Sequence, residues 1–329
     1  MTRGQAGALL VLALLGAIGL GVFWGPVAIS PRGVLAALLG DGTADHRWIV
    51  VQHRLPRALL ASLVGGGLAL AGATFQALLR NPLAEPYILG ISGGAAVGAV
   101  LALSLGWVAA GSGVLPAMAF AGALVAILLV FRVASAADRR LDVRVLLLAG
   151  VVVGAFFSAV IAFILSVSDA ATVRSAVVWM MGSVADADWK AVGVAAAYTL
   201  PACAVLLALG RALNLLSVGE ETALYLGIEV ERVKRLAFGV ASLVTAAGVA
   251  VAGVIGFVGL VVPHGLRLVV GSDHRALLPL SFLAGAAFLT GADTVARVAL
   301  APTEIPIGVV TAFVGVPVFL VLLRRSLSA

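Results

Sequence analysis

The chain contains ten apolar stretches, each near the length that a helix needs to cross a bilayer, and no other feature limits its fold as strongly. They lie at 6–25, 55–79, 87–106, 114–133, 143–167, 190–210, 235–254, 255–271, 276–298 and 306–325. A membrane-spanning helix needs about 20 mainly apolar residues, whereas a strand of a membrane β-barrel needs only about 10 alternating ones. The sequence therefore predicts an all-α polytopic membrane protein of about ten transmembrane helices. Between the seventh and eighth stretches only glycines, near 253–256, indicate a turn.

The composition fits this class of protein. Of the 329 residues, 62% are hydrophobic and 11% are charged, whereas a soluble domain carries roughly 25% charged residues. We expect one transmembrane domain over residues 1–329. No small-residue cleavage site follows the first apolar run, from Ala6 to Phe23, so we expect an uncleaved first span and not a signal peptide.

Few side chains suit catalysis, metal binding or nucleic-acid binding. The histidines (His46, His53, His264 and His274) do not have the spacing of metal ligands. The single Cys203 excludes an internal disulfide and a Cys-rich metal site. The sequence has no nucleophile elbow, no phosphate-binding Gly-x-x-x-x-Gly-Lys, and no basic run interleaved with aromatics. We expect no catalytic residue, no metal, no cofactor and no nucleic-acid partner.

A dense block of charge at 211–235 interrupts the apolar pattern and must face water. Ser217 and Glu220 have the spacing of a capping box, and Gly227 is typical of a helix C-terminus. We expect a short amphipathic helix at about Glu220 to Leu226. The segment is interpreted either as an ordinary loop or, our preferred hypothesis, as a docking site for a partner.

The basic residues predict the orientation of the chain. Ten spans place both termini on one side, and fourteen of the 21 Lys and Arg residues then lie on that side. Cytoplasmic loops carry the excess of Lys and Arg. We therefore expect a multi-pass protein of the cell (inner) membrane with both termini, and the segment 211–235, in the cytoplasm.

An internal repeat is also indicated. A shift of 181 residues places the Gly-x-Ala-x-Ala-Gly of 67–72 on that of 248–253, Pro82 on Pro263, and Gly90 on Gly271. The second helix then matches the seventh, and an offset of five helices makes the two copies run in opposite directions. Helices 2–5 and 7–10 would form an inverted repeat, as in many transporters. Chance matching of small residues is the alternative.

Three arginines at the predicted outer side, Arg54, Arg57 and Arg297, oppose the charge bias. They would either extend toward lipid headgroups or form a basic ring for the acidic groups of an extracytoplasmic partner. Arg297 also lies one helical turn from Asp293, so a local ion pair is a further interpretation.

The energy source separates the function classes that remain. The apolar stretches contain no good candidate for the mid-membrane ionisable group that an ion-coupled carrier usually needs. Energy from a cytoplasmic partner is therefore favoured over a stand-alone secondary transporter of a small organic solute. A membrane-embedded enzyme is disfavoured, because no His, Asp or Glu residues cluster at either face.

Several ordered segments resemble the FecCD/BtuC-type permeases of ABC importers, which take up ferric siderophores, haem or cobalamin. The resemblance runs from about Arg54 to Arg325, and the matching segments are 54–98, 219–227 (GEETALYLG), 253–279, 291–297 (GADTVAR) and 304–319 (EIPIGVVTAFVGVPVF). It implies a ten-helix subunit that forms a homodimer or pseudo-dimer, two cytoplasmic ATPase subunits and an extracytoplasmic substrate-binding protein.

The resemblance also implies roles for particular residues. The segment 211–235 would be a cytoplasmic coupling loop that docks on the ATPase, through Ser217, Gly219, Glu220, Glu221, Ala223, Leu226 and Gly227. Arg54, Arg57 and Arg297 would meet glutamates of the binding protein. Gly150, Gly154, Ser158 and Arg174 would line the translocation pathway, and 134–142 would form its inner gate. ATP-driven alternating access would then move the substrate, and no residue indicates which of the three substrate types is carried.

Overall fold

The computed structural model describes residues 2–111, 113–137 and 143–327, which form helices and no strand. The helices are α1 (Arg3–Phe23), α2 (Pro31–Leu39), α3 (Ala44–Arg47), η1 (Trp48–Arg54), α4 (Leu55–Leu78), η2 (Pro86–Leu89), α5 (Ile91–Ser104), η3 (Trp107–Ala110), α6 (Val114–Ala137), α7 (Val143–Ser166), α8 (Ala170–Met180), α9 (Trp189–Ala208), α10 (Gly210–Val218), α11 (Glu220–Tyr225), α12 (Val230–Ala252), α13 (Val258–Val270), α14 (His274–Val298) and α15 (Ile307–Leu327).

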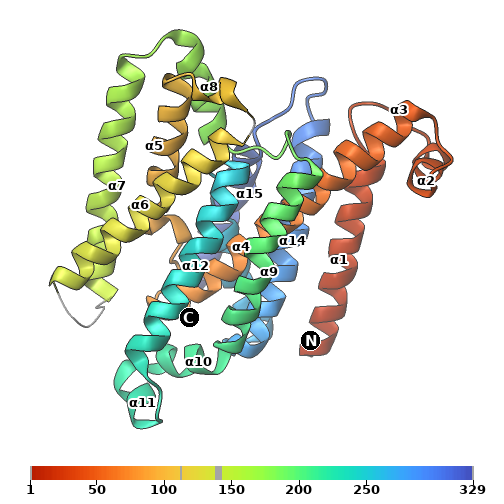
Figure 1. The fold of residues 1–329 in the computed structure, drawn as a ribbon. Helices are drawn as coiled ribbons and strands as arrows, with labels where there is room; N and C mark the ends of the chain where they lie inside the picture. The colour runs from red at the N-terminus through yellow and green to blue at the C-terminus, as the bar shows by residue number, and fades with distance from the viewer. Residues whose placement is uncertain (1, 112, 138–142, 328–329) are drawn as a thin grey trace.

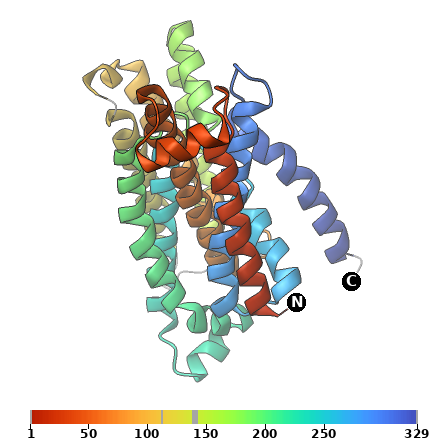
Figure 2. The same ribbon diagram turned by 90° about the vertical axis from the view of Figure 1, so that its right-hand side faces the viewer.

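Each of the ten apolar stretches corresponds to one of these helices: α1, α4, α5, α6, α7, α9, α12, α13, α14 and α15. Within the described residues, seven helices are long and apolar enough to cross a membrane, and three more are apolar but shorter. The prediction of an all-α polytopic membrane protein is confirmed. Figure 2 shows α15 leaning away from the other helices.

The centre of the bundle is α4, which packs against α1, α9, α12, α13 and α14 (Figure 1). Nearly all of its side chains are buried. Small residues permit this close packing. Because lipid provides no hydrophobic driving force for helix association, helices in a membrane associate through close contact between their backbones. At Gly65 and Gly72 a methyl group would overlap the backbone carbonyl groups of Gly285 and Gly259.

Replacement of Gly72 by alanine is therefore expected to destabilise the protein, because the carbonyl of Gly259 cannot rotate away as a side chain would. We expect the free energy of unfolding to fall by about 1–3 kcal/mol, the usual cost of overpacking. Gly16→Ala is the control, since no atom lies near the added methyl there. Thermal unfolding in detergent measures both variants, and equal unfolding temperatures would contradict the packing argument.

The glycine turn expected near 253–256 is present and separates α12 from α13. Gly253 and Phe257 both have positive φ, +68° and +69°. Backbone groups released at this break are bonded by side chains of the segment before α5. The Tyr87 hydroxyl donates to the Ile255 carbonyl (3.1 Å) and accepts from its N–H (3.2 Å), and Glu85 accepts from the Phe257 N–H (2.8 Å). Such bonding is required where irregular backbone lies within a membrane.

The predicted repeat is supported at α4 and α12 but fails as one fixed shift. Glu220 contacts both Arg80, just after α4, and Lys234, near the start of α12, so the two helices run in opposite directions. The shift of 181 residues is wrong beyond the shared Gly/Ala motif. Pro82 precedes η2 whereas Pro263 lies inside α13, and Gly90 precedes α5 whereas Gly271 follows α13. The reason is that α4 continues past the motif, whereas α12 ends there.

The start of α1 lies at the same end as α10 and α11, hereafter the inner end; the opposite end is the outer end. Arg3 pairs with Asp273 (2.7 Å), which also accepts from the amide of Asn214 on α10 (2.7 Å). The Asn214 amide, the backbone N–H of Arg275 and the Arg3 guanidinium lower the pKa of Asp273. Figure 2 shows that α15 also runs from the outer end toward this end of the bundle.

Candidate functional sites

The segment 211–235 folds as α10 without its first residue, the short α11 and the start of α12, and it projects from the inner end (Figure 1). The helix expected at Glu220 to Leu226 is present as Glu220–Tyr225. Gly227 ends it as predicted, with φ +79° and with the Ile228 N–H donating to the Ala223 carbonyl (3.0 Å).

The predicted capping box is wrong. Ser217 lies inside α10, and its hydroxyl donates to the Asn214 carbonyl three residues earlier (2.7 Å). The N-cap of α11 is Gly219, which has no side chain to accept a hydrogen bond. The physical reason is that α10 continues to Val218, so Ser217 has helical backbone and cannot reach the next helix.

The solvent-facing part of α11 is apolar. We define the apolar tip as the four exposed side chains around α11: Val218, Leu224, Tyr225 and Leu226. Tyr225 is the most exposed of them, at 89%. Reasoning from the charges missed Leu224 and Tyr225, although the Leu-Tyr-Leu run among charged residues was a usable signal. Ala223 is fully buried, so it packs α11 onto the bundle and is not a surface contact.

Glu220 faces the bundle and joins three elements. Its carboxylate pairs with Lys234 of α12 (3.1 Å) and with Arg80 after α4 (3.7 Å). Lys234 is buried and also contacts Glu231 (3.3 Å). The neighbouring Glu221 is exposed. Glu220 thus ties α11 to the two central helices of the bundle.

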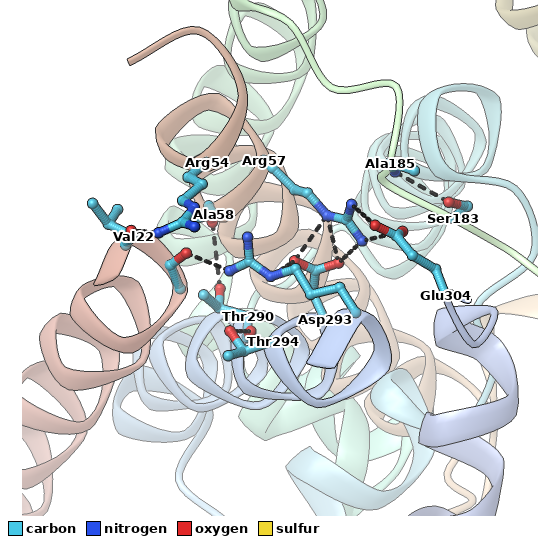
Figure 3. Close-up of polar contacts among 12 residues, drawn as sticks. Val22, Arg54, Arg57, Ala58, Ser183, Ala185, Thr290, Asp293, Thr294 and Glu304 are labelled. Carbon is cyan, nitrogen blue, oxygen red and sulfur yellow. Dashed lines mark hydrogen bonds and ion pairs between the residues drawn. The ribbon is translucent and has the colours of Figure 1, made fainter. Parts of the chain in front are cut away.

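The outer end contains an ionic cluster with a buried centre. We define the buried ionic cluster as the buried Arg57, Asp293 and Arg297 together with the exposed Glu304; Figure 3 labels Arg57, Asp293 and Glu304. Arg57 donates through Nε to both carboxylate oxygens of Asp293 (2.9 and 3.1 Å). Its two terminal nitrogens donate to the two oxygens of Glu304 (3.0 and 2.9 Å). The expected pair of Asp293 with Arg297 is present at 3.8 Å. Paired planar groups of this kind form the strongest hydrogen bonds of arginine.

Two arginines at the outer end bond to the C-terminal end of α1. Arg54 donates to the carbonyls of Val22 and Phe23 (both 3.1 Å) and of Val27, and Arg297 donates to that of Gly21. A helix leaves its last carbonyls without intrahelical partners and carries partial negative charge there, which cations stabilise. Arg54, Arg57 and Arg297 are all buried, so the interpretation that they extend to lipid headgroups is wrong.

The expected pathway residues differ in how far they are exposed. Gly150 and Gly154 face Ile88 and Gly90, so at Gly150 the missing side chain permits helix packing and does not line a passage. Ser158 is exposed and donates to the Gly154 carbonyl (3.0 Å). Arg174 is exposed on α8. Of the predicted inner gate at 134–142, residues 138–142 lie outside the described residues. Elsewhere in the described chain, no group of three His, Cys, Asp or Glu residues could hold a metal ion.

The described residues thus form a multi-pass helical bundle of membrane-protein type, with a projecting helix at its inner end and an ionic cluster at its outer end. The model of the FecCD transport family matches residues 9–325, and the chain belongs to that family.

Named relatives agree with this assignment. The chain is 48% identical to the cobalamin import system permease protein BtuC of Halobacterium salinarum, over 88% of this chain and 77% of that protein. It is 40% identical to the hemin transport system permease protein HmuU of Yersinia pestis, over 98% and 96% of the two chains.

Solved structures show the same architecture. A transporter assigned to the metal-chelate ABC type, solved in an inward-facing conformation, superposes with a TM-score of 0.86 at 32% identity, covering 98% of this chain and all of that one. PsaBC from Streptococcus pneumoniae, solved with a Fab, shares the fold alone, with a TM-score of 0.56 at 16% identity over 84% and 93% of the chains.

Proposed function

We propose that this chain is the transmembrane permease subunit of an ABC importer that moves a ferric siderophore, haem or cobalamin into the cytoplasm. The observation that carries the proposal is the apolar tip at the inner end, backed by the ion pairs of Glu220. Exposed apolar side chains that lie together on a water-facing segment mark a surface for a partner. Membership of the FecCD family and the names of the relatives support the choice of substrates.

The proposed assembly contains two copies of this chain, two cytoplasmic ATPase subunits and an extracytoplasmic binding protein. Both termini lie in the cytoplasm of this assembly. The leaning α15 supports the second copy, because a groove between it and the end of α8 is apolar and open. Its lining includes Met180, Met181, Val309, Phe313 and Val316.

In the proposed mechanism, the apolar tip sits in the ATPase, and Glu220 transmits its movement. When the ATPases close on ATP, they displace α11. The pairs of Glu220 with Arg80 and Lys234 carry that displacement to α4 and α12, which cross the whole bundle. The paired permeases then change the side to which they open.

Replacing Glu220 by glutamine is expected to preserve ATPase binding and to reduce ATP-driven uptake. The apolar tip stays intact, whereas the ion pairs of residue 220 with Lys234 and Arg80 are lost. Breaking a buried ion pair costs about 3–5 kcal/mol, and partial exposure of Glu220 places the expected stability loss below that range. Uptake into proteoliposomes and binding to the ATPase are both measured. Arg232→Gln is the control, because its pair with Glu229 is exposed. Uptake at the level of this control would contradict the transmitting role.

The proposed function is tested by reconstituting the permease with its ATPase and binding protein in vesicles. If the proposal is correct, uptake requires ATP on the side of the membrane where the ATPase subunits bind. Uptake by the permease alone, driven by an ion gradient, would instead identify a secondary transporter. The absorption spectrum of the ligand that the binding protein retains distinguishes haem, corrinoid and ferric siderophore.

A further inference from the structure

The segment between α1 and α4 forms a side arm at the outer end of the bundle. We define the outer strap as residues 24–54, which include α2, α3 and η1. Figure 1 shows α2 and α3 projecting sideways from the end of α1. Helix α2 has defined ends, because the Ser30 hydroxyl accepts from the Gly33 N–H (3.2 Å) and Gly40 follows the helix with φ +92°.

Helix α2 is apolar on two faces, and only one of them is covered by protein. Val34 and Ala37 are buried against a small core formed by Val22, Ile29 and Val50. On the other side Leu35, Leu38 and Leu39 are exposed, Leu39 by 79%. Three neighbouring uncovered leucines on a nine-residue helix indicate a surface that meets something other than water.

Exposed tryptophans indicate the depth of the strap relative to the membrane. Trp24 and Trp48 lie on the strap itself, and Trp107 and Trp189 lie at the outer ends of α5 and α9; all four are exposed. The Trp189 indole N–H donates to the Val51 carbonyl (3.0 Å), which ties the start of α9 to the strap. Tryptophan gathers where a membrane meets water, because its ring is apolar and its N–H is polar.

The uncovered face of α2 also continues a lipid-facing surface. The preceding α1 exposes Leu12, Leu15 and Leu20 along its length, and in a membrane these contact hydrocarbon. The chain passes directly from that surface, through Trp24, into α2. Charged residues, Arg32, Asp45 and Arg47, are exposed on the same strap, so it is amphipathic as a whole.

We propose that α2 lies in the outer leaflet at the boundary between headgroups and acyl chains, with Leu35, Leu38 and Leu39 in lipid. An amphipathic helix with an apolar face and basic flanks takes this position. Arg32 and Arg47 face the headgroup phosphates. The strap also holds Arg54, whose guanidinium bonds to the end of α1, so lipid contact at α2 fixes the outer end of α1 beside the buried ionic cluster.

Site-directed spin labelling tests the position of α2. The full chain carries Cys203→Ser, so that a single new cysteine at Leu39 takes the nitroxide, in vesicles of phosphatidylethanolamine and phosphatidylglycerol. Leu12 on α1 is the hydrocarbon reference, and the exposed Glu229, in the charged segment at the inner end, is the water reference. Collision with oxygen and with a water-soluble nickel chelate is compared. We expect the oxygen-to-nickel ratio at 39 to be severalfold higher than at 229 and lower than at 12.

Two outcomes would overturn the proposal. Nickel accessibility at 39 equal to that at 229 would place α2 in water. Protection from both reagents would show a protein surface, either a second copy or another subunit, over the leucines. A label at Leu35 repeats the measurement one turn earlier and guards against a local effect of the probe. The result does not depend on the cargo or on the ATPase, so it can fail while the proposed function holds.

Discussion

Replacement of Tyr225 by aspartate is expected to abolish stable binding of the ATPase while leaving the permease folded. Tyr225 is the most exposed large side chain of the apolar tip, at 89%. Exposed aromatic residues of this kind dominate the binding energy of interfaces, with losses of about 2 kcal/mol or more on truncation, or about 30-fold in Kd. Burying a new carboxylate in an apolar groove adds a desolvation cost to that loss.

The measurement is co-purification and titration of the ATPase against the detergent-solubilised permease. Tyr225→Phe is the matched control, because it keeps the ring and removes only the hydroxyl. The control is expected to bind normally. Loss of binding only in a variant that also unfolds at lower temperature would mean that Tyr225 acts through structure. Normal binding by a folded Tyr225→Asp variant would remove α11 as the docking element.

Ala223, which the resemblance also placed in the docking surface, gives a weaker test. Its methyl group is fully buried, so a bulky residue there forces α11 away from α10 and α12. Lost ATPase binding in such a variant would have two explanations. The exposed Leu224 and Tyr225 avoid this ambiguity.

The fold was predictable because hydrocarbon allows few solutions. Each apolar run of helical length became a helix, and even the break at Gly253 was marked by glycine. The register of the repeat was not predictable, since glycine and alanine recur too often for one shift to be specific. Ser217 shows a second limit: a cap motif cannot indicate whether the preceding helix already includes its first residue.

Local sequence likewise predicted some contacts of the charged residues and not others. The position of Glu220 near α11 followed from local sequence, and the position of Asp293 one turn before Arg297 did as well. The partners of Arg54 and Arg57 did not, because they come from α1, from α14 and from the loop before α15, all distant in sequence. A count of charges by side treats each arginine as free, and it cannot detect that a helix end or a carboxylate holds it.

Replacement of Arg57 by methionine is expected to destabilise the protein by about 3–5 kcal/mol, the usual cost of removing one partner from a buried ion pair. Asp293 is almost fully buried and would keep only Arg297 at 3.8 Å, whereas Glu304 can turn toward water because it is partly exposed. Most of the lost stability therefore comes from Asp293, which stays buried with one weaker partner. Thermal or denaturant unfolding in detergent measures it, and Arg174→Met, an exposed arginine, is expected to change stability by less than about 0.5 kcal/mol.

The double variant Arg57→Met with Asp293→Leu identifies the cause. The pair of Arg57 with Asp293 is lost in either single variant, so the two losses are expected to be less than additive in the double variant, even though Asp293→Leu also removes the carboxylate that faces the buried Arg297 (3.8 Å). Additive losses would instead show that Arg57 contributes through packing.

The same cluster bears on capture of the binding protein. Arg54→Glu with Arg57→Glu would place new negative charge beside Asp293 and Glu304, so weaker capture could reflect unfolding. Glu304→Gln keeps the pair of Arg57 with Asp293 (2.8 Å) and frees one side of the guanidinium. If Arg57 receives a carboxylate of the binding protein, this variant is expected to capture it more tightly, and unchanged affinity would leave Arg57 a purely structural residue.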